Sequence, residues 1–317
     1  MTTVTVRRTE FFDFEALRDA VQDGSLEVVQ LEHGKISGTL THISVGSLGI
    51  STGSFSRGVR FRGALSEQRW QIGMTLSAPA LIEHVETTPG DHIITAPHQE
   101  FYSSHHSGNQ YAAAFITPSE LFAFLDAQQP GAADAWRRAN SVLKTDPAAA
   151  AINVAQFRMV LAALNTHGPA LPDEVVEFYK RRILELLTAP IRTTGYRGPH
   201  PKSAAKLVRA VDRYLVDAGN RPVHISELCE RFEVPRRSLH RAFDDVLGIP
   251  PITFLRRKRL GDVHTALLRA GPGVTISGIS IKHGFGDDGR FAKEYRLLFG
   301  ELPHETLRRR NVIVNRN

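Results

Sequence analysis

ISELCERFEVPRRSLHRAFDDVLG, residues 225–248, decides the fold of the C-terminal part of this chain. Its apolar residues recur every three or four positions, on one face of a short helix up to Phe232 and of a second helix after Pro235. Val234 and Pro235 predict a tight turn between the helices, and Gly248 predicts the end of the second one. The stretch therefore predicts a helix, a short turn and a second helix.

The same pattern returns about fifty residues later in the chain. Six pairs of positions share one offset of 52 residues: Leu239/Phe291, Phe243/Tyr295, Val246/Leu298, Leu247/Phe299, Gly248/Gly300 and Pro251/Pro303. This register indicates a tandem of two similar units. Between the units, the segment from Pro251 to Ala270 predicts a connecting helix of roughly 20 residues, which spans ~30 Å at 1.5 Å per residue.

The outward faces of both units carry side chains that suit nucleic acid. Arginine can pair with guanine O6 and N7, while short polar side chains and helix N-termini bind phosphate oxygens. Successive major-groove faces of B-DNA lie ~34 Å apart, so the tandem favours two DNA-reading helices over an ordinary solvated surface. The candidate DNA contacts are Arg236, Arg237, Ser238, His240 and Arg241 in the first unit, Arg257 in the connecting helix, and Asp288, Gly289, Arg290, Lys293 and Arg296 in the second unit.

Charge is distributed unevenly between the two parts of the chain. From His200 onward there are 22 Lys and Arg against 13 Asp and Glu, whereas the first 199 residues hold 17 basic and 20 acidic side chains. Lysine and arginine release condensed counterions when they meet phosphates, so a basic segment attracts polyanions. A well-solvated surface is the alternative explanation of the charge alone.

At these positions the sequence resembles the AraC/XylS family of bacterial transcription regulators, over about Ser203 to Arg309. The resemblance implies two recognition helices, at Arg236–Leu247 and Asp287–Phe299, with double-stranded DNA and RNA polymerase as partners. The residues that carry it are Leu239-x-Arg241-x-Phe243, Gly248-x-x-Pro251, Arg259-Leu260, Ile279, Gly284-Phe285, Phe291, Phe299-Gly300 and Pro303.

The first part of the chain predicts an antiparallel β domain followed by helices. Short runs with strand chemistry are Leu26–Gln30, Gly38–Ile43, Gly58–Arg62, Trp70–Met74, His92–Thr95 and Tyr111–Ile116. Helical spacing follows at Ser119–Ala127, Ala132–Leu143, Asp146–Leu164 and Pro172–Leu187. We expect these helices to pack on the β domain or on a second copy of the chain. The predicted fold class is α+β, with a cupin-like antiparallel β domain and an all-α domain of two helix-turn-helix units.

Three segments follow from this division. We expect residues 1–187 to form one domain, for which the family resemblance implies effector binding and dimerisation, and residues 203–317 to form the double helix-turn-helix domain. Between them, residues 188–202 read TAPIRTTGYRGPHPK, where three prolines and two glycines interrupt any helix or strand period. This segment is the predicted linker.

A second, weaker resemblance concerns the run Gly289–Glu301 and the stretch from Leu31 to Gly73. Both are similar to regulators related to the ethanolamine-utilisation activator. This resemblance implies an N-terminal domain that senses a small metabolite, an amine or a cobalamin, and that dimerises. It transfers no ligand-binding residue.

Enzymatic chemistry finds little support in the sequence. Seven of the 14 histidines lie in the first 106 residues, and His98, Glu100, His105 and His106 are conceivable ligands of a cupin-type metal site. No two of these histidines stand two residues apart on a strand with the expected carboxylate after them, which favours loop histidines and no metal. A phosphate-binding GxxxxGK[ST] loop and a GxSxG nucleophile motif are both absent. The sequence therefore predicts no enzyme and no certain cofactor.

The sequence as a whole predicts a sequence-specific DNA-binding transcription regulator whose N-terminal domain responds to a small metabolite. The alternatives are a metal-dependent cupin-type enzyme fused to a DNA-binding segment and an architectural DNA binder without sequence preference. A single cysteine, Cys229, and the lack of an apolar block near the start predict a cytoplasmic protein without disulfides and without a membrane partner.

Overall fold

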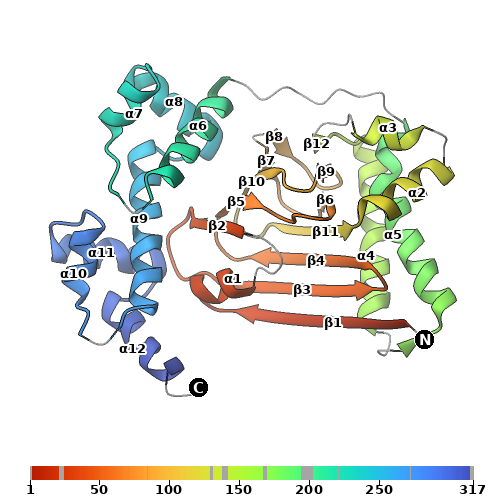
Figure 1. The fold of residues 1–317 in the computed structure, drawn as a ribbon, viewed down its shortest axis with the longest axis horizontal. Helices are drawn as coiled ribbons and strands as arrows, with labels where there is room; N and C mark the ends of the chain where they lie inside the picture. The colour runs from red at the N-terminus through yellow and green to blue at the C-terminus, as the bar shows by residue number, and fades with distance from the viewer. Residues whose placement is uncertain are drawn as a thin grey trace.

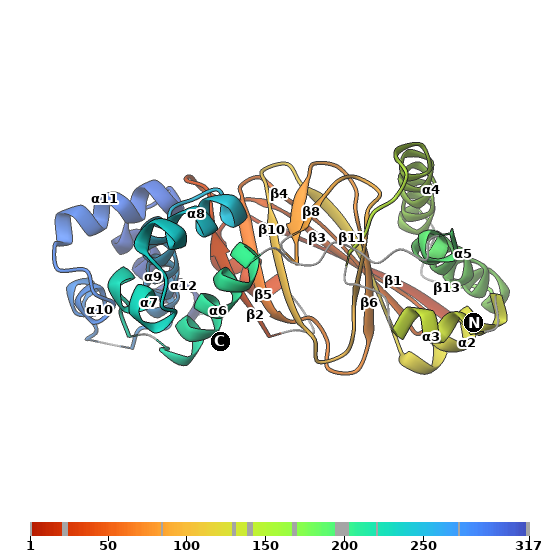
Figure 2. The same cartoon turned by 90° about the horizontal axis from the view of Figure 1, so that it is seen from above.

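A computed structural model describes residues 2–20, 25–83, 85–128, 131–137, 142–166, 170–193, 203–219, 221–271 and 273–314. The parts of the molecule lie in a row (Figures 1 and 2). Two β sheets occupy the middle, the helices between residues 118 and 193 lie at one end, and the helices between residues 203 and 314 lie at the other.

The strands of the described residues form two antiparallel sheets. The larger sheet has eight strands in the described residues, in the order β12 (Val142–Leu143), β9 (His92–Thr95), β6 (Trp70–Thr75), β11 (Gln110–Ile116), β4 (Leu48–Phe55), β3 (Gly38–Val45), β1 (Thr2–Phe11) and β13 (Ala170–Leu171). The smaller sheet has five in the same residues: β2 (Ser25–Gln30), β5 (Val59–Ala64), β10 (Glu100–His105), β7 (Ala80–Ile82) and β8 (Val85–Thr87). This arrangement confirms the expected antiparallel β domain.

The strand predictions are confirmed where apolar residues alternate or cluster. Five of the six runs expected as strands lie within β2, β3, β6, β9 or β11, and the run Gly58–Arg62 begins one residue before β5. Strands β1, β4 and β10 were not predicted. Strand β4 reads LGISTGSF, in which small polar residues obscure the alternation, and pairing on both sides holds it in place, with Ile50 opposite Ile43 of β3 and Ala114 of β11.

Helix α1 (Phe14–Ala20) precedes β2, and four helices follow the last long strand: α2 (Pro118–Gln128), α3 (Ala132–Arg137), α4 (Pro147–Thr166) and α5 (Asp173–Thr193). The expected helix over Ala132–Leu143 is wrong in its second half. Helix α3 ends at Arg137, and Val142–Leu143 form β12 because they pair with His92 and Ile93 of β9. Helix α5 continues to Thr193, inside the predicted linker, whose remaining residues 194–202 lie outside the described residues.

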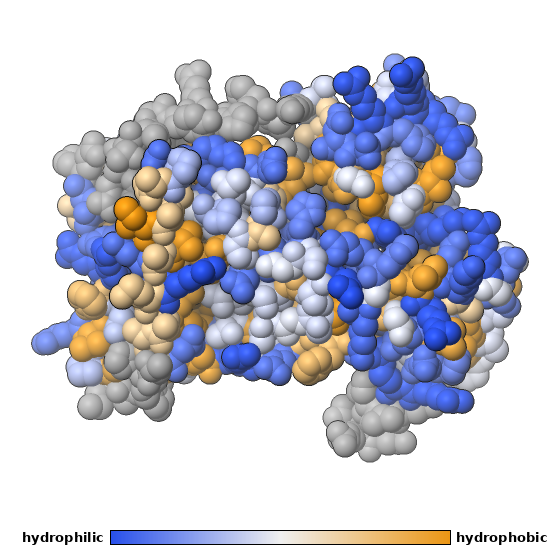
Figure 3. All heavy atoms as spheres, turned by 180° about the vertical axis from the view of Figure 1, so that it is seen from behind, coloured by the Kyte–Doolittle hydropathy of each residue, from blue (hydrophilic) through white to orange (hydrophobic). Residues whose placement is uncertain are grey.

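Helix α4 has an unusual surface. Within the described residues, the segment Pro147–Asn165 is the one helix long and apolar enough to cross a membrane by length and composition, and a third of its window is buried. Phe157 and Leu164 pack it into the core of the larger sheet. On its other face, Ile152 and Met159 are 60% and 72% exposed, and Figure 3 shows apolar surface along this edge at the left of the view. Helix α4 thus packs like a core helix with one uncovered side.

The C-terminal domain consists of helices in the described residues: α6 (Ser203–Asp217), α7 (Ile225–Arg231), α8 (Arg236–Leu247), α9 (Pro251–Leu268), α10 (Ile276–Lys282), α11 (Asp288–Phe299) and α12 (Pro303–Val314). The bounds of α8 and α11 lie 52 residues apart, and so do the starts of α9 and α12. The structure therefore confirms the tandem repeat, with α9 as the connecting helix shared by both units.

The two helix-turn-helix units share their cores with the β domain. Phe14, Leu17 and Val28 of the N-terminal part belong to one apolar cluster with Leu260 and Phe299. A second cluster joins Val29 and Leu31 to the core of the first unit, which contains Leu239 and Phe243. Because each unit buries apolar surface against the β domain, the domains are docked rather than merely linked.

Candidate nucleic-acid interface

In the first unit, the residues at the two ends of α8 determine where this helix begins and ends. Pro235 is the N-cap of α8 and fixes the backbone at the tight turn, while Gly248 ends the helix in the left-handed conformation, with φ of 66°. Leu239 and Phe243 are fully buried against α6 and α7. The buried stripe leaves the opposite face of α8 open to solvent.

The second unit is built in the same way with different caps. The Oγ1 of Thr275 accepts a hydrogen bond from the Gly278 amide at the start of α10. The Oδ1 of Asp287 accepts one from the Arg290 amide, 2.8 Å away, at the start of α11. Gly300 ends α11 in the left-handed conformation, with φ of 74°. Figure 1 shows α8 and α11 toward opposite ends of α9, and Figure 2 shows both on the same side of it.

Most of the predicted contacts in α8 are exposed. Arg236, Arg237, Ser238 and Arg241 all lie on the solvent side of the helix. Arg241 has a loose ion pair with Asp245, at 3.8 Å, so its guanidinium is free to exchange this partner for a phosphate. His240 is half-buried, and its Nε2 is buried without a partner in the described residues.

In α11 the predicted contacts separate into two groups. Gly289, Lys293 and Arg296 are exposed. Asp288 is exposed too, but its carboxylate faces α10 and accepts hydrogen bonds from the hydroxyls of Ser277 and Ser280, at 3.0 and 3.1 Å. Asp288 therefore fixes α11 against α10, which positions the residues that follow it.

Arg290 belongs to a charged group that spans both units. Its Nε lies 3.0 Å from the Oε1 of Glu294, and the same oxygen lies 3.0 Å from the Nη1 of Arg256 on α9. Sequence reasoning did not assign Arg256 to the site. The sequence shows a basic run at Arg256–Arg259, but the contact with Glu294 depends on how α9 and α11 cross. The shared carboxylate holds two guanidiniums at the same edge of α11.

Arg257 lies apart from the exposed helix faces. Its Nη2 is 3.2 Å from the Nε2 of His33, in the loop between β2 and β3, and its Nε and Nη1 are buried without a partner in the described residues. Burial lowers the pKa of the Arg257 guanidinium, and burial together with the Arg257 charge lowers the pKa of His33. The β domain thus holds this predicted DNA contact.

Comparisons with known proteins agree with this geometry. A family model described as a helix-turn-helix domain matches residues 228–309. The XylDLEGF operon transcriptional activator 1 of Pseudomonas putida is 27% identical over 145 residues, which are 45% of this chain and 42% of that protein. The transcriptional activator RhaS of Pectobacterium carotovorum is 30% identical over 153 residues, 48% of this chain and 54% of that protein.

The chain also resembles a solved structure, that of a probable AraC family transcriptional regulator from Rhodopseudomonas palustris. The sequence identity is 34%, the match covers 33% of this chain and 97% of the other, and the TM-score is 0.31. This chain spans less than half the length of most of the first curated relatives that it matches. The relatives are named as transcription regulators and not as enzymes. The chain belongs to the AraC/XylS family of transcription regulators.

Proposed function

We propose that this chain binds double-stranded DNA at specific sequences and regulates transcription there. The observation that carries the proposal is the pair of exposed cationic helices, α8 and α11, joined by α9. The 18 residues of α9 span ~27 Å at 1.5 Å each, close to the ~34 Å between successive major-groove faces of B-DNA. Each helix can therefore enter its own major groove on one side of the duplex.

The predicted contacts divide by their chemistry. The fork of Arg290 suits the edge of a guanine, whereas Lys293 and Arg296 suit phosphate oxygens. In α8, the exposed arginines likewise suit guanine edges, and Ser238 suits phosphate oxygens. Arg257 reaches a phosphate only when it leaves His33. The relatives' names favour activation, in which the bound protein contacts RNA polymerase in the cytoplasm.

The sharpest test of this proposal is the variant Arg290→Ala. Selection from random duplexes and mapping of genomic occupancy first give the preferred site of the wild-type protein. At that site the variant should lose about 1–3 kcal/mol of binding free energy and relax the preference at one base pair, since it loses a bidentate contact. Binding is measured by fluorescence anisotropy at fixed salt. Arg308→Ala, an exposed arginine on α12, is the matched control.

Other results would change the role assigned to Arg290 or the function proposed for the chain. Equal weakening on every sequence makes Arg290 a phosphate contact, and unchanged binding removes it from the interface. Diffuse genomic occupancy without a preferred site would favour the architectural DNA binder. The cupin-type enzyme would require a metal, and in the described part of the chain no three His, Cys, Asp or Glu side chains gather to hold one.

We further propose that a small effector binds inside the β domain, in a cavity of about 200 Å³ that we call the sheet cavity. Its lining comes from both sheets, as expected of a cupin-like domain, and includes Gln71, Ser103, His105 and Tyr111. The Oε1 of Gln71 is buried and has no hydrogen-bond partner in the described residues. A buried acceptor beside a cavity is costly unless a ligand or water donates to it.

The size and polar lining of the sheet cavity favour an amine over a cobalamin, the two effectors that the weaker resemblance implies. A small amine fits about 200 Å³ and can donate to Gln71, whereas a cobalamin is far too large. Calorimetric titration of the full chain with ethanolamine should show binding that Gln71→Leu abolishes and that Gln68→Leu, at an exposed position, leaves intact. Equal heats from both variants would remove the sheet cavity as the amine site.

A second copy of the chain is the partner that best fits the uncovered side of the N-terminal helices. Ile152 and Met159 of α4 and Phe178 of α5 are all exposed, and large exposed apolar side chains gathered on one end of a protein commonly mark an interface. A dimer through α4 and α5 leaves the helix-turn-helix units free, since they lie at the opposite end of the molecule (Figure 1).

A further inference from the structure

Helix α11 carries an acidic side chain, Glu294, one helical turn after the predicted base contact Arg290. The Oε1 of Glu294 accepts hydrogen bonds from the Nε of Arg290 and from the Nη1 of Arg256 on α9, both at 3.0 Å. The Glu294 side chain is 21% exposed, whereas that of Arg290 is 65% exposed. A carboxylate at this place opposes the attraction between α11 and the phosphates of DNA.

The first helix-turn-helix unit contains an ordinary ion pair for comparison. Arg241 and Asp245 on α8 also stand four residues apart, but they are separated by 3.8 Å and both side chains are more than half exposed. Exposed pairs of this kind hold their side chains only weakly in water. Glu294 differs because a second helix supplies a cation to the same oxygen and because the carboxylate is largely buried.

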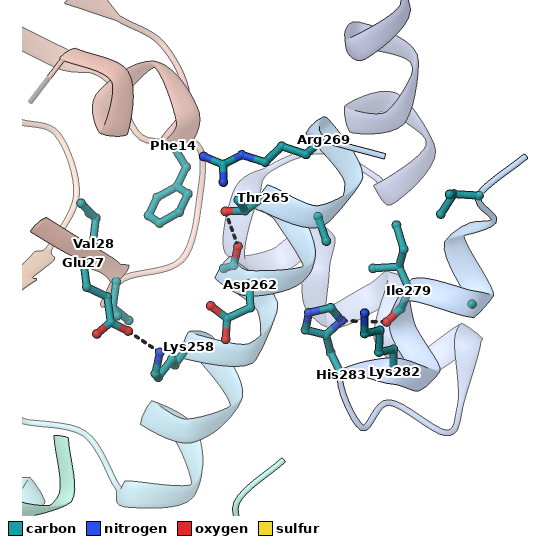
Figure 4. Close-up of a pocket in the computed structure, with 15 residues that line it drawn as sticks. Phe14, Glu27, Val28, Lys258, Asp262, Thr265, Arg269, Ile279, Lys282 and His283 are labelled. Carbon is teal, nitrogen blue, oxygen red and sulfur yellow. Dashed lines mark hydrogen bonds and ion pairs between the residues drawn. The ribbon is translucent and has the colours of Figure 1, made fainter. Parts of the chain in front are cut away.

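Arg256 belongs to a helix that is fixed on both sides. Apolar side chains of α9 are buried in the cores of both units. Two residues after Arg256, Lys258 forms an ion pair with Glu27, and Figure 4 shows this pair between α9 and β2. Arg256 therefore gives Glu294 a partner whose backbone is held in place by the rest of the protein.

The contact with Glu294 leaves the end of the Arg290 guanidinium open. Within the described residues only the Nε of Arg290 is bonded, so Nη1 and Nη2 keep their N–H donors. Arg290, Glu294 and Arg256 all line a hollow of about 250 Å³ next to residues 284–287, so a partner molecule can approach them. A guanine presents O6 and N7 as two neighbouring acceptors to such a fork. One edge of the guanidinium is thus held by the protein, and the other edge is available to a base.

We propose that Glu294 is a positioning residue that sets the base preference of α11. It holds the fork of Arg290 in one orientation before DNA arrives, so less side-chain entropy is lost when the fork meets a guanine. At a wrong base, the fork can turn to a neighbouring phosphate only by breaking its contact with Glu294. This role rests on the DNA binding proposed above, and it gives up some non-specific affinity in return for specificity.

The variant Glu294→Ala separates positioning from simple attraction. We expect its affinity for random duplex to rise about two- to threefold, because a negative charge near the phosphates is removed. We expect its preference for the base pair read by Arg290 to fall roughly three- to tenfold, because the fork is no longer held. Fluorescence anisotropy at fixed salt measures both quantities, on the preferred site, on that site with single base-pair changes and on random duplex.

Asp245→Ala is the matched control, because it removes the same charge from the exposed pair on α8. It should strengthen binding to random duplex in the same way and leave the preference at every base pair unchanged. Loss of base preference in this control as large as in Glu294→Ala would overturn the positioning role, since the removed charge alone would then account for the effect.

The variant Glu294→Asp tests the geometry at constant charge. Its side chain is one methylene shorter, so its carboxylate cannot hold both guanidiniums at once. We expect the base preference to fall as in Glu294→Ala, while the affinity for random duplex stays at the wild-type value. Equal weakening on every sequence would make Glu294 a residue that only stabilises the fold and would overturn the proposal.

The variants also distinguish a failure of this inference from a failure of the proposed function. If Arg290→Ala relaxes the preference at one base pair while both Glu294 variants retain it, the proposed function stands and the positioning role is wrong. A wild-type protein without any preferred site would overturn both.

Discussion

Two buried histidines make the β domain sensitive to acid. Burial lowers the pKa of His92 and of His105 to about 4, from an ordinary value near 6.5. His92 lies between the larger sheet and the helices, with its Nε2 3.2 Å from the Nδ2 of Asn153. His105 contacts Asn109 and Ser103 beside the sheet cavity. Both imidazoles are therefore neutral in the folded protein at pH 7.

This neutrality gives a signed pH dependence of stability. As the pH falls below about 6.5, these histidines become protonated in the unfolded chain, whereas in the folded chain they stay neutral until the pH approaches 4. The free energy of unfolding therefore decreases between pH 6.5 and pH 4. Each histidine contributes up to about 1.4 kcal/mol per pH unit. Urea unfolding at pH 7, 6 and 5 should show this loss, and His92→Gln should reduce its slope. His304→Gln, at an exposed position, should not. Identical slopes in all three proteins would contradict the assignment.

At the scale of elements, local sequence patterns predicted the helix-turn-helix units far better than the sheets. The bounds of α8 follow from Pro235, an apolar stripe and Gly248, which are all local signals. Strand β12 does not, because Val142–Leu143 become a strand only by pairing with β9, fifty residues earlier. Strand β1 was missed although it pairs with β3 over most of its length, from Val4 to Phe11. Such pairing is a tertiary property.

The same division applies to the candidate interface. Helical periodicity placed Arg236 and Arg290 on outward faces because a buried stripe fixes the opposite side. It could not show that Asp288 bonds back to α10, or that Arg257 meets His33, since those contacts join segments that lie apart in the sequence. The sequence thus predicts which side chains face solvent. The packing of distant elements determines which of these side chains already bind other residues of the protein.

At the scale of the whole molecule, a buried ion pair fastens the first helix-turn-helix unit to the β domain. The guanidinium of Arg60 on β5 forms two hydrogen bonds with the carboxylate of Asp212 on α6, and the two side chains are 4% and 3% exposed. The Nη1 of Arg62 donates to the Asp212 carbonyl, 2.7 Å away. The second unit is fastened separately, by an ion pair between Arg309 and Asp13 at 2.5 Å. The docked domains should therefore unfold together.

Removal of one member of the buried pair tests this coupling. Asp212→Ala leaves the Arg60 charge buried without its partner, which should cost about 3–5 kcal/mol and separate the unfolding of the two domains. Both tryptophans, Trp70 and Trp136, lie before residue 203, so their fluorescence reports the N-terminal part, while circular dichroism at 222 nm also follows the C-terminal helices. The two urea transitions should coincide in the wild type and diverge in the variant. Arg60→Met/Asp212→Leu should restore most of the stability, since an apolar pair can replace a buried ion pair. Coincident, unshifted transitions in Asp212→Ala would show that the apolar clusters alone couple the domains.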